Sequence, residues 1–456
     1  MRIGTPKTRT LSPSIVRWCI LIAGCLLISC LVSPRKATEH FETSSADSAI
    51  AGYHVRSYFH GGVGKEWKSV YRSGSLLDDS ENFYDPPASM KITGTDTPSN
   101  IIEKVLDPPE NVCGDVFVSV KLLGGNQANL SAISLMSISL IGGKTYADSA
   151  NYSFHQPVKD SLLTDPGRWT RVNMAMRTFS SSPTFNCHDV ERVRIRLSAQ
   201  PGTDDTVSLG ELAFYPSPLA QAALIITEDD QWADFDTNGL PAMRKYGFPG
   251  TVYANCGLLG VANKMTMERL KTLQDSGGWT IASHLWSHDT ITNLTDDSAA
   301  ASLRQNAEFL QANGFKGYRH FAYPYGIMNR AKDSVVRRYA ETARLVVGWQ
   351  EGEGLPYPDL HRLRVLGFLE RRVTLEMAKS AIDQLVANKT AGILGVHEIV
   401  LDGDLDTRKW YRPDWEAMMD YVGTLVRQGK LKVYALDDYM RMVSAFNRPQ
   451  PARASP

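Results

Sequence analysis

Two acidic side chains follow an apolar run near the middle of the 456-residue chain. The run reads LIITEDD over residues 224–230, so Asp229 and Asp230 come directly after a predicted buried strand. Two adjacent carboxylates at such a place are costly unless a positive group lies beside them. A bound metal ion is the simplest such group, and a solvated acidic turn or a helix cap is the alternative.

Two histidines end a second strand-like segment, TIASHLWSH over residues 280–288. The spacing of His284 and His288 predicts that both imidazoles lie on one face of a helical turn, where they can bind a single ion. One aspartate and two neutral histidines form the ligand set of a catalytic zinc-type site, with one position open for water.

Two further segments end with groups that suit acyl chemistry. The segment FAYPYG (321–326) predicts a strand followed by a Pro/Gly turn, which can direct a backbone N–H at a carbonyl oxygen that gains negative charge. In ILGVH (393–397), His397 ends an apolar strand. A single histidine at a strand end is usually structural, but this one is the third to reach the same edge.

The elements that must position these residues alternate after residue 217. Repeated strand and helix patterns favour an α/β layer or barrel of parallel strands, in which chemistry gathers at the carboxyl ends of the strands. The expected strands are residues 222–227, 250–255, 280–282, 319–323, 392–397 and 431–436, and the expected helices are residues 236–246, 266–276, 299–312, 330–341, 374–387 and 413–428.

The preceding region, residues 51–216, has a different pattern. Short alternating runs such as VRIRL (193–197) are separated by Gly, Pro, Asn and Asp, which predicts antiparallel strands in a β-sandwich similar to a jelly roll. Such a domain could bind carbohydrate. The aromatic residues that could stack on sugars, or else form the core, are Tyr58, Phe59, Trp67 and Tyr71.

The composition excludes several classes of protein. Of the residues, 43% are hydrophobic and 21% are charged, as in globular chains, and the length predicts two domains. The 49 Lys and Arg balance 49 Asp and Glu, and without residues 1–30 the balance becomes 45 basic against 49 acidic. We therefore expect no nucleic-acid partner. Nothing in the sequence points to a protein partner.

The N-terminal segment predicts export. Residues 18–32 form an uncharged apolar run of 15 residues after four basic side chains. Because a membrane-spanning helix needs about 20 residues, this pattern favours a bacterial-type signal over residues 1–30. Cys25 and Cys30 each follow small residues, and acylation of either would tether the protein to a membrane; the alternative is that both are filler in a cleaved signal. We expect a periplasmic or cell-envelope protein.

The sequence also gives expectations for the flanking segments and the remaining cysteines. Residues 31–50 are polar and small, which is typical of a linker, and residues 447–456 are predicted to be a disordered tail. An oxidising compartment would allow a disulfide between Cys113 and Cys187. Cys256 is expected to be a buried, inert thiol.

In chain order, the four segments described above resemble those of the polysaccharide deacetylases, the NodB-homology enzymes of carbohydrate esterase family 4. The resemblance covers about half of the chain. It implies a distorted (β/α) barrel over residues 217–446, following the N-terminal all-β sandwich.

The resemblance also implies roles. The family segment TFDDG is matched by TEDDQ (227–231), which implies Asp229 as general base and Asp230 as a metal ligand. It implies His284 and His288 as the other ligands, His397 as general acid, and the backbone amide of Tyr325 as oxyanion donor. The implied cofactor is a divalent metal, first of all Zn²⁺, although Co²⁺, Ni²⁺ or Fe²⁺ suit the same ligands.

The chain departs from the family pattern in several places. Glu228 replaces an apolar or aromatic residue, and Gln231 replaces a glycine. Ala322 stands where the family has an arginine that orients the catalytic aspartate. Arg319 lies three residues upstream, and we expect one of two later arginines to substitute. Those two candidates are Arg362 and Arg364.

A further departure concerns the substrate pocket. Gly395 stands where the family has a pocket leucine, and Leu394 and Val396 are the candidates to fill that place.

The sequence therefore predicts a metal-dependent hydrolase that removes N-acetyl groups from an exported or cell-surface polysaccharide, such as poly-N-acetylglucosamine, a chitin-like glycan or peptidoglycan. One alternative keeps the machinery and acts as an O-acetyl esterase. Another is a non-catalytic glycan-binding lipoprotein, which Glu228, Gln231 and the missing arginine suggest. The enzyme is favoured because every ligand and both proton-transfer residues are present.

Overall fold

The computed structural model describes residues 50–57, 66–71, 76–79, 89–94, 100–124, 133–143, 145–154, 169–199, 205–346, 352–401 and 408–447. The predicted signal with Cys25 and Cys30, the linker through residue 49 and the tail from residue 448 lie outside the described residues. A search of the described helices finds none that is long and apolar enough to span a membrane.

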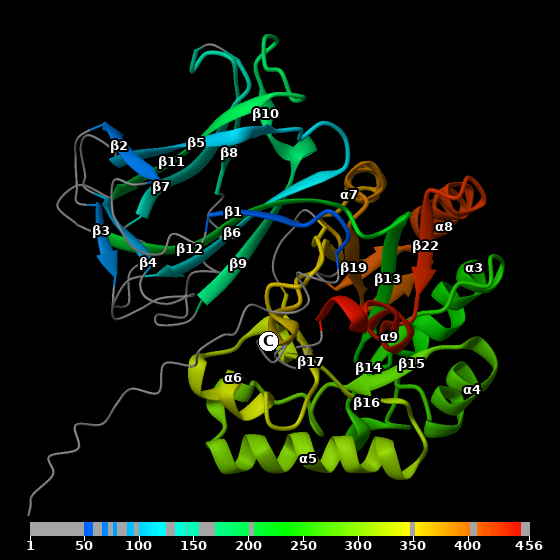
Figure 1. The fold of residues 1–456 in the computed structure, drawn as a ribbon. Coiled ribbons are helices and arrows are strands. Elements are labelled where there is room, and N and C mark those ends of the chain that lie inside the picture. Colours follow the sequence, from blue (N-terminus) through cyan, green and yellow to red (C-terminus); the bar gives the residue numbers. More distant parts are fainter. Residues whose placement is uncertain are drawn as a thin grey trace, which may run out of the picture. The chain divides into compact units, whose positions relative to one another are not determined.

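Two antiparallel sheets share one hydrophobic core in the first half of the described chain (Figure 1). Their strands bury alternate side chains; in β11, for example, Val193, Ile195 and Leu197 are buried. One sheet has the order β3-β4-β12-β6-β9, with β1 beside β12. Its strands are β1 (His54–Ser57), β3 (Leu76–Asp79), β4 (Ser89–Gly94), β6 (Val116–Gly124), β9 (Trp169–Ala175) and β12 (Asp205–Pro216). The other sheet has the order β10-β8-β7-β11-β5-β2. Its strands are β2 (Trp67–Tyr71), β5 (Asn100–Glu110), β7 (Ile133–Ile141), β8 (Ser149–Ser153), β10 (Ser180–Ser181) and β11 (Val190–Ala199).

This arrangement confirms the predicted antiparallel all-β region, while its assignment to the jelly-roll class stays a prediction. The disulfide between Cys113 and Cys187 is present. Trp67 is buried in the shared core, which confirms the core alternative for this residue. Tyr58 and Phe59 lie outside the described residues, as does the side chain of Tyr71.

The second half of the described chain is built on a sheet of eight parallel strands. Every side chain of β13 (Ala222–Asp229) is buried, as expected for a central parallel strand that is covered on both faces. Its carboxyl half lies between β14 and β19. The order of the strands in the sheet is β17-β16-β15-β14-β13-β19-β18, with β22 beside β13. The other strands are β14 (Thr251–Ala254), β15 (Thr280–Ser283), β16 (Gly317–Ala322), β17 (Thr342–Arg344), β18 (Gly367–Leu369), β19 (Ala391–Val396) and β22 (Leu431–Tyr434).

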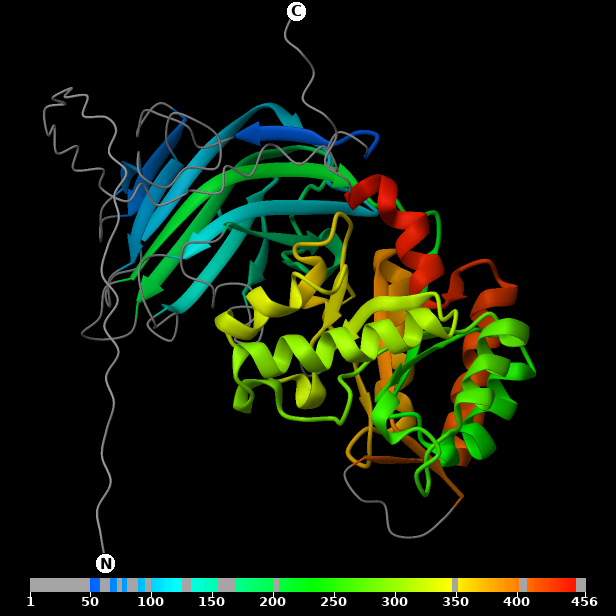
Figure 2. The ribbon, with the colours of Figure 1, turned by 90° about the horizontal axis from the view of Figure 1, so that it is seen from below.

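Helices surround these parallel strands, as the turned view in Figure 2 shows. Those that the sequence predicts carry amphipathic patterns, whereas the last helix, Leu436–Asn447, was not predicted. The helices are α3 (Leu240–Arg244), α4 (Met267–Gly277), α5 (Asp296–Ala312), α6 (Arg330–Val336), α7 (Leu375–Asn388), α8 (Arg412–Arg427) and α9 (Leu436–Asn447), and a small parallel pair, β20 (Glu398–Val400) and β21 (Lys409–Tyr411), completes the region.

The predicted alternation of strand and helix is therefore confirmed, with local differences. The expected helix at 236–246 is a π-helical turn, Phe235–Gly239, followed by the short α3. The sequence pattern missed β17 and β18, which have three residues each. Both short strands reach the same edge of the sheet as β13, and both contribute to the site described next.

Candidate active site

The carboxylates at the end of β13 line a cavity of about 410 Å³. Asp229 is 2% exposed and Asp230 is 6% exposed, so both are buried as the sequence predicts. Asp230 has a positive φ of 77°, and its N–H donates to the carbonyl of Tyr253 at 3.0 Å. The chain thus leaves the extended conformation at Asp230, and both side chains reach the cavity.

His284 and His288 lie in the loop that follows β15, next to Asp230. His284 Nε2 lies 3.6 Å from Asp230 Oδ1, and His288 Nε2 lies 3.2 Å from the same oxygen. The predicted helical turn is wrong: Leu285 and His288 have positive φ values of 64° and 59°, and residues 284–290 contain no helix. The two rings are nevertheless close, with centroids 4.9 Å apart.

These three side chains fit a divalent cation. Their ligand atoms all lie within 4.8 Å of one another, and the buried Oδ1 of Asp230 makes no hydrogen bond. His284 Nδ1 lies 2.8 Å from the carbonyl of Ala322 and must donate to it, which leaves the lone pair on Nε2 for a metal. Burial, followed by the neighbouring His284, lowers the pKa of His288 to about 4, so its imidazole is neutral at pH 7.

The second carboxylate, Asp229, is held by an arginine that the sequence analysis did not find. Arg344, the last residue of β17, is fully buried, and its Nη2 lies 2.7 Å and 2.5 Å from the two oxygens of Asp229. The expectation that Arg362 or Arg364 would take this place is wrong. Arg362 pairs with Asp333 and Asp359, and Arg364 pairs with Glu353.

His397 follows β19 and lines the same cavity. Its ring stacks on Phe368 from β18, with centroids 5.0 Å apart and planes at 29°. A Cβ atom at Gly395 would lie 2.5 Å from the Phe368 ring, so the glycine makes room for this contact. The expectation that Leu394 or Val396 fills the pocket is therefore wrong: both lie in the hydrophobic core, and Phe368 lines the cavity.

The turn after β16 brings Tyr325 to the cavity. Tyr325 has a positive φ of 59° and a side chain that is 60% exposed, and its ring centroid lies 4.6 Å from that of His288. The next residue, Gly326, also has a positive φ, and a Cβ atom there would lie 2.4 Å from Val346. The turn is thus packed closely against the segment that follows Arg344.

Gln231, which replaces the family glycine, connects the loops of the site. It has a positive φ of 50°, and its amide group both donates to the carbonyl of Asn255 and accepts from the Asn255 N–H. Asn255 Nδ2 in turn donates to the carbonyls of His284 and Leu285. The loop of the aspartates and the loop of the histidines are thereby fixed to one another.

Glu228, the other departure, is fully buried beneath the two aspartates. Its Oε1 accepts a hydrogen bond from the N–H of Trp232 at 2.7 Å. Burial raises the pKa of Glu228 well above its ordinary value, and the charges of Asp230 and Asp229 add to this shift. The neutral form of the Glu228 carboxyl group is therefore favoured, which limits the negative charge next to the two aspartates.

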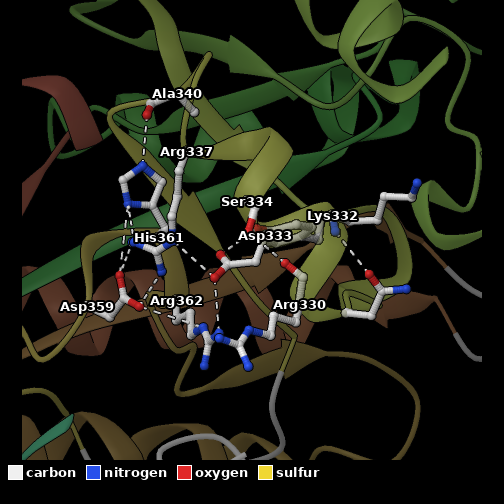
Figure 3. Close-up of polar contacts among 11 residues, drawn as sticks. Arg330, Lys332, Asp333, Ser334, Arg337, Ala340, Asp359, His361 and Arg362 are labelled. Atoms are coloured by element: carbon white, nitrogen blue, oxygen red, sulfur yellow. Dashed lines mark hydrogen bonds and ion pairs between the residues drawn. The ribbon is translucent and has the colours of Figure 1, made fainter. Parts of the chain in front are cut away.

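Beside the site, a cluster of charged groups joins α6 to residues 359–362 (Figure 3). Asp333 accepts from Arg337 Nε and from Arg362 Nη2, each at 3.0 Å. Arg337 Nη2 also donates to Asp359 at 2.5 Å. The hydroxyl of Tyr323 donates to Asp333 at 3.3 Å, so the cluster braces the strand end that leads into the turn of Tyr325.

His361 completes this cluster as a neutral member. Its Nε2 donates to the carbonyl of Ala340 at 2.8 Å, while its Nδ1 accepts from Arg337 at 3.2 Å (Figure 3). Burial lowers the pKa of His361, and the adjacent guanidinium of Arg337 lowers it further. These contacts indicate a structural role for His361.

Residues 217–343 match the family model described as polysaccharide deacetylase. This part of the chain is similar to the polysaccharide deacetylases. The matched segment includes the two aspartates, the histidine pair and the Tyr325 turn. The match ends one residue before Arg344, so Arg344, Phe368 and His397 lie beyond it.

Several curated proteins are similar to part of this chain. Poly-beta-1,6-N-acetyl-D-glucosamine N-deacetylase of Staphylococcus aureus (strain MSSA476) is 26% identical over 150 residues, which are 29% of this chain and 51% of that protein. The protein of the same name from strain COL is also 26% identical over 150 residues. The chain thus spans about half the length of the curated relatives it matches.

Solved structures are also similar to about half of this chain. A family 4 carbohydrate esterase from Streptomyces lividans is 17% identical with a TM-score of 0.33, covering 46% of this chain and 91% of that one. A family 4 acetyl xylan esterase from Clostridium thermocellum is 13% identical with a TM-score of 0.34, covering 48% and 91%.

The ion pair between Arg344 and Asp229 gives a first prediction. Arg344→Gln should lower kcat about 100-fold, because Asp229 loses its orientation, and should lower the free energy of unfolding by about 3–5 kcal/mol, because a buried carboxylate is left unpaired. The double variant Arg344→Gln/Asp229→Asn should regain part of the lost stability. Acetate release and urea unfolding measure these effects.

The control for this prediction is Arg319→Gln, which removes an exposed arginine that pairs with Glu341. Its kcat and unfolding midpoint should equal those of the wild type. Full activity in Arg344→Gln would contradict the assignment of Arg344.

His361 gives a prediction on pH. Because its pKa in the folded protein is below the value of about 6.5 in the unfolded chain, the unfolded chain binds more protons just below pH 6.5. The free energy of unfolding should therefore fall as the pH is lowered below 6.5, and His361→Gln should make this dependence shallower. Urea unfolding at a series of pH values between about 5 and 8 measures the slope. His54→Gln, which changes an exposed histidine, should keep the wild-type slope, and identical slopes in all three proteins would refute the prediction.

Proposed function

We propose that this protein is a divalent-metal-dependent hydrolase that removes N-acetyl groups from an exported or cell-surface polysaccharide. One observation carries the proposal: Asp230, His284 and His288 converge in the cavity that also receives Asp229 and His397. The deacetylase family match and the name of the staphylococcal relatives support acetamide cleavage on an N-acetylglucosamine polymer.

Asp230, His284 and His288 are the proposed metal ligands, and Zn²⁺ is the ion that their one oxygen and two nitrogens suit first. Co²⁺, Ni²⁺ or Fe²⁺ can bind the same set, since nitrogen and oxygen ligands discriminate weakly among them. When bound, the ion supplies Lewis-acid polarisation of the acetyl carbonyl and makes water a better nucleophile at neutral pH.

The chain's own groups would move the protons. Asp229, oriented by Arg344, accepts a proton from the attacking water. The Tyr325 N–H lies in a turn where it can donate to the carbonyl oxygen as that oxygen becomes negative. His397, in its protonated form, gives a proton to the leaving amine nitrogen. Burial lowers the pKa of His397, and the charges of Asp229 and Asp230 oppose this by favouring the protonated imidazole. Phe368, stacked on His397, keeps that ring in place.

Export belongs to the proposal. Residues 1–30 are proposed as the signal, with acylation of Cys25 or Cys30 as the route to a membrane tether, and a periplasmic or cell-envelope location follows. A disulfide in the described region agrees with an oxidising compartment.

The proposed metal site gives a direct test. Asp230→Ala and His284→Ala should each lower the amount of bound metal. Each should also reduce acetate release from N-acetylglucosamine oligomers by more than about 100-fold, which is the largest loss expected for a residue that only supports a metal ligand. Metal analysis of the purified protein and an acetate assay give the two readouts. His54→Ala, at an exposed position far in sequence from the site, is the control and should match the wild type.

The same assay separates the alternatives. Acetate release from acetylxylan but not from N-acetylglucosamine oligomers would indicate an O-acetyl esterase. Metal-free protein that binds the oligomers without releasing acetate would instead support the non-catalytic glycan-binding protein.

A further inference from the structure

Three buried amide side chains connect the loops that carry the proposed metal ligands. Gln231, Asn255 and Asn306 are each 0% exposed, and we call them the amide network. Gln231 follows Asp230 at the end of β13, Asn255 follows β14, and Asn306 lies in α5. None of the three is among the described residues that line the cavity. They can therefore act on the site only through the residues that they hold.

Asn255 supports the backbone of the histidine loop. Its Nδ2 donates to the carbonyl groups of both His284 and Leu285. Leu285 has a positive φ of 64°, and His288 has a positive φ of 59°. Side chains with a Cβ atom rarely adopt this conformation, and it persists only where the surrounding contacts favour it. The hydrogen bonds from Asn255 supply such contacts at Leu285 and at the metal-ligand residue before it.

Asn306 holds the two strand ends that meet at His284. Its Oδ1 accepts from the N–H of Cys256, and its Nδ2 donates to the carbonyl of Ala254 and to the hydroxyl of Ser283, each at 2.9 Å. The N–H of His284 donates to the same Ala254 carbonyl at 3.0 Å. One side chain thus holds both the residue before His284 and the group that receives the His284 N–H.

Gln231 connects this network to the loop of the aspartates. Its Nε2 donates to the carbonyl of Asn255 at 3.1 Å, and its Oε1 accepts from the N–H of Asn255 at 2.9 Å. Gln231 and Asp230 have consecutive positive φ values of 50° and 77°. The amide pair therefore fixes a strained segment of backbone, from which the Asp230 carboxylate reaches the two histidines.

Backbone strain in the described chain is concentrated in these two loops. Seven of its non-glycine residues have a positive φ, and Asp230, Gln231, Leu285 and His288 are four of them. The hydrogen bonds of the amide network join side-chain amides to backbone groups and to one hydroxyl, so they do not use the atoms that would bind an ion. The strained ligand geometry can therefore form before an ion binds.

We infer that the amide network preorganises the proposed metal site, so that Gln231, Asn255 and Asn306 are positioning residues that set the affinity for the ion. The inference rests on the proposed function, because it requires the metal site of that proposal. An ion that meets ligands already in place does not have to order two loops, and it therefore binds more tightly. Gln231, at which the chain departs from the family pattern, thereby has a role of its own.

The substitution Gln231→Met tests the connection between the two loops. Methionine is also long and unbranched, but it can make neither hydrogen bond to Asn255. The Kd for Zn²⁺, measured by competition with a chelator, should rise about 10–100-fold, the range for loss of a residue that supports a metal ligand. The visible absorption spectrum of bound Co²⁺ should also change, because the arrangement of its ligands changes.

Gln231→Gly is a second variant that guards against misfolding. Glycine adopts a positive φ without strain, so this substitution removes both hydrogen bonds and relieves the backbone at the same time. The variant should unfold cooperatively in urea and should still bind Zn²⁺ more weakly than the wild type.

The matched control is Gln274→Met. Gln274 is also buried; its Nε2 donates to the carbonyl of Gly314 at 3.0 Å and its Oε1 accepts from the N–H of Lys316 at 2.8 Å. It makes the same pair of hydrogen bonds away from the cavity lining. Gln274→Met should lower the urea midpoint about as much as Gln231→Met, but it should leave the Kd for Zn²⁺ and the Co²⁺ spectrum unchanged.

The outcomes separate this inference from the proposed function. Wild-type affinity for Zn²⁺ in both Gln231 variants, or an equal loss of affinity in Gln274→Met, overturns the positioning role and leaves the metal site in place. If the wild-type protein binds neither Zn²⁺ nor Co²⁺, the proposed function fails and the inference fails with it.

Discussion

Three consecutive carboxyl groups are buried at the end of β13, and the arrangement of the site depends on how each is accommodated. Glu228, Asp229 and Asp230 are all shielded from water, where an unpaired charge is costly. Each carboxyl group is stabilised by a different interaction. Glu228 has a raised pKa and a hydrogen bond from Trp232, Asp229 has a buried arginine, and Asp230 has two imidazoles and room for a cation. This division leaves one carboxylate for the proposed general base and another for the proposed metal ligand.

The parallel sheet makes this division feasible, because its strands end at one edge and come from distant parts of the sequence. Arg344 from β17 and Phe368 from β18 both reach the end of β13, and the Arg344 guanidinium also lies against the rings of Tyr253 and Phe368. Phe368 therefore contacts both Arg344 and His397. A single aromatic side chain thus connects the group that orients the proposed base with the proposed acid.

The sequence predicted the residues that form continuous motifs and missed those that depend on distant contacts. The carboxylates, the histidine pair and His397 were predictable because each follows a strand-like run in the sequence. Arg344 and Phe368 were not, because a strand of three residues is too short to show a periodic pattern. The backbone of the histidine loop was also mispredicted: Leu285 takes a left-handed conformation while its carbonyl accepts from Asn255, and i, i+4 spacing alone does not reveal this contact.

The departures from the family pattern are better explained as replacements than as decay. A glycine after the second aspartate would adopt a positive φ freely, whereas Gln231 adopts 50° at a cost on the order of 1 kcal/mol. That cost is offset by two hydrogen bonds to Asn255, which also holds the histidine loop. The arginine missing at Ala322 is likewise replaced from the neighbouring strand, since Ala322 is paired in register with Arg344. Arg344 lies on the neighbouring strand at the same register as Ala322, and from there its side chain reaches Asp229. An arginine therefore pairs with this aspartate although it comes from a later place in the sequence.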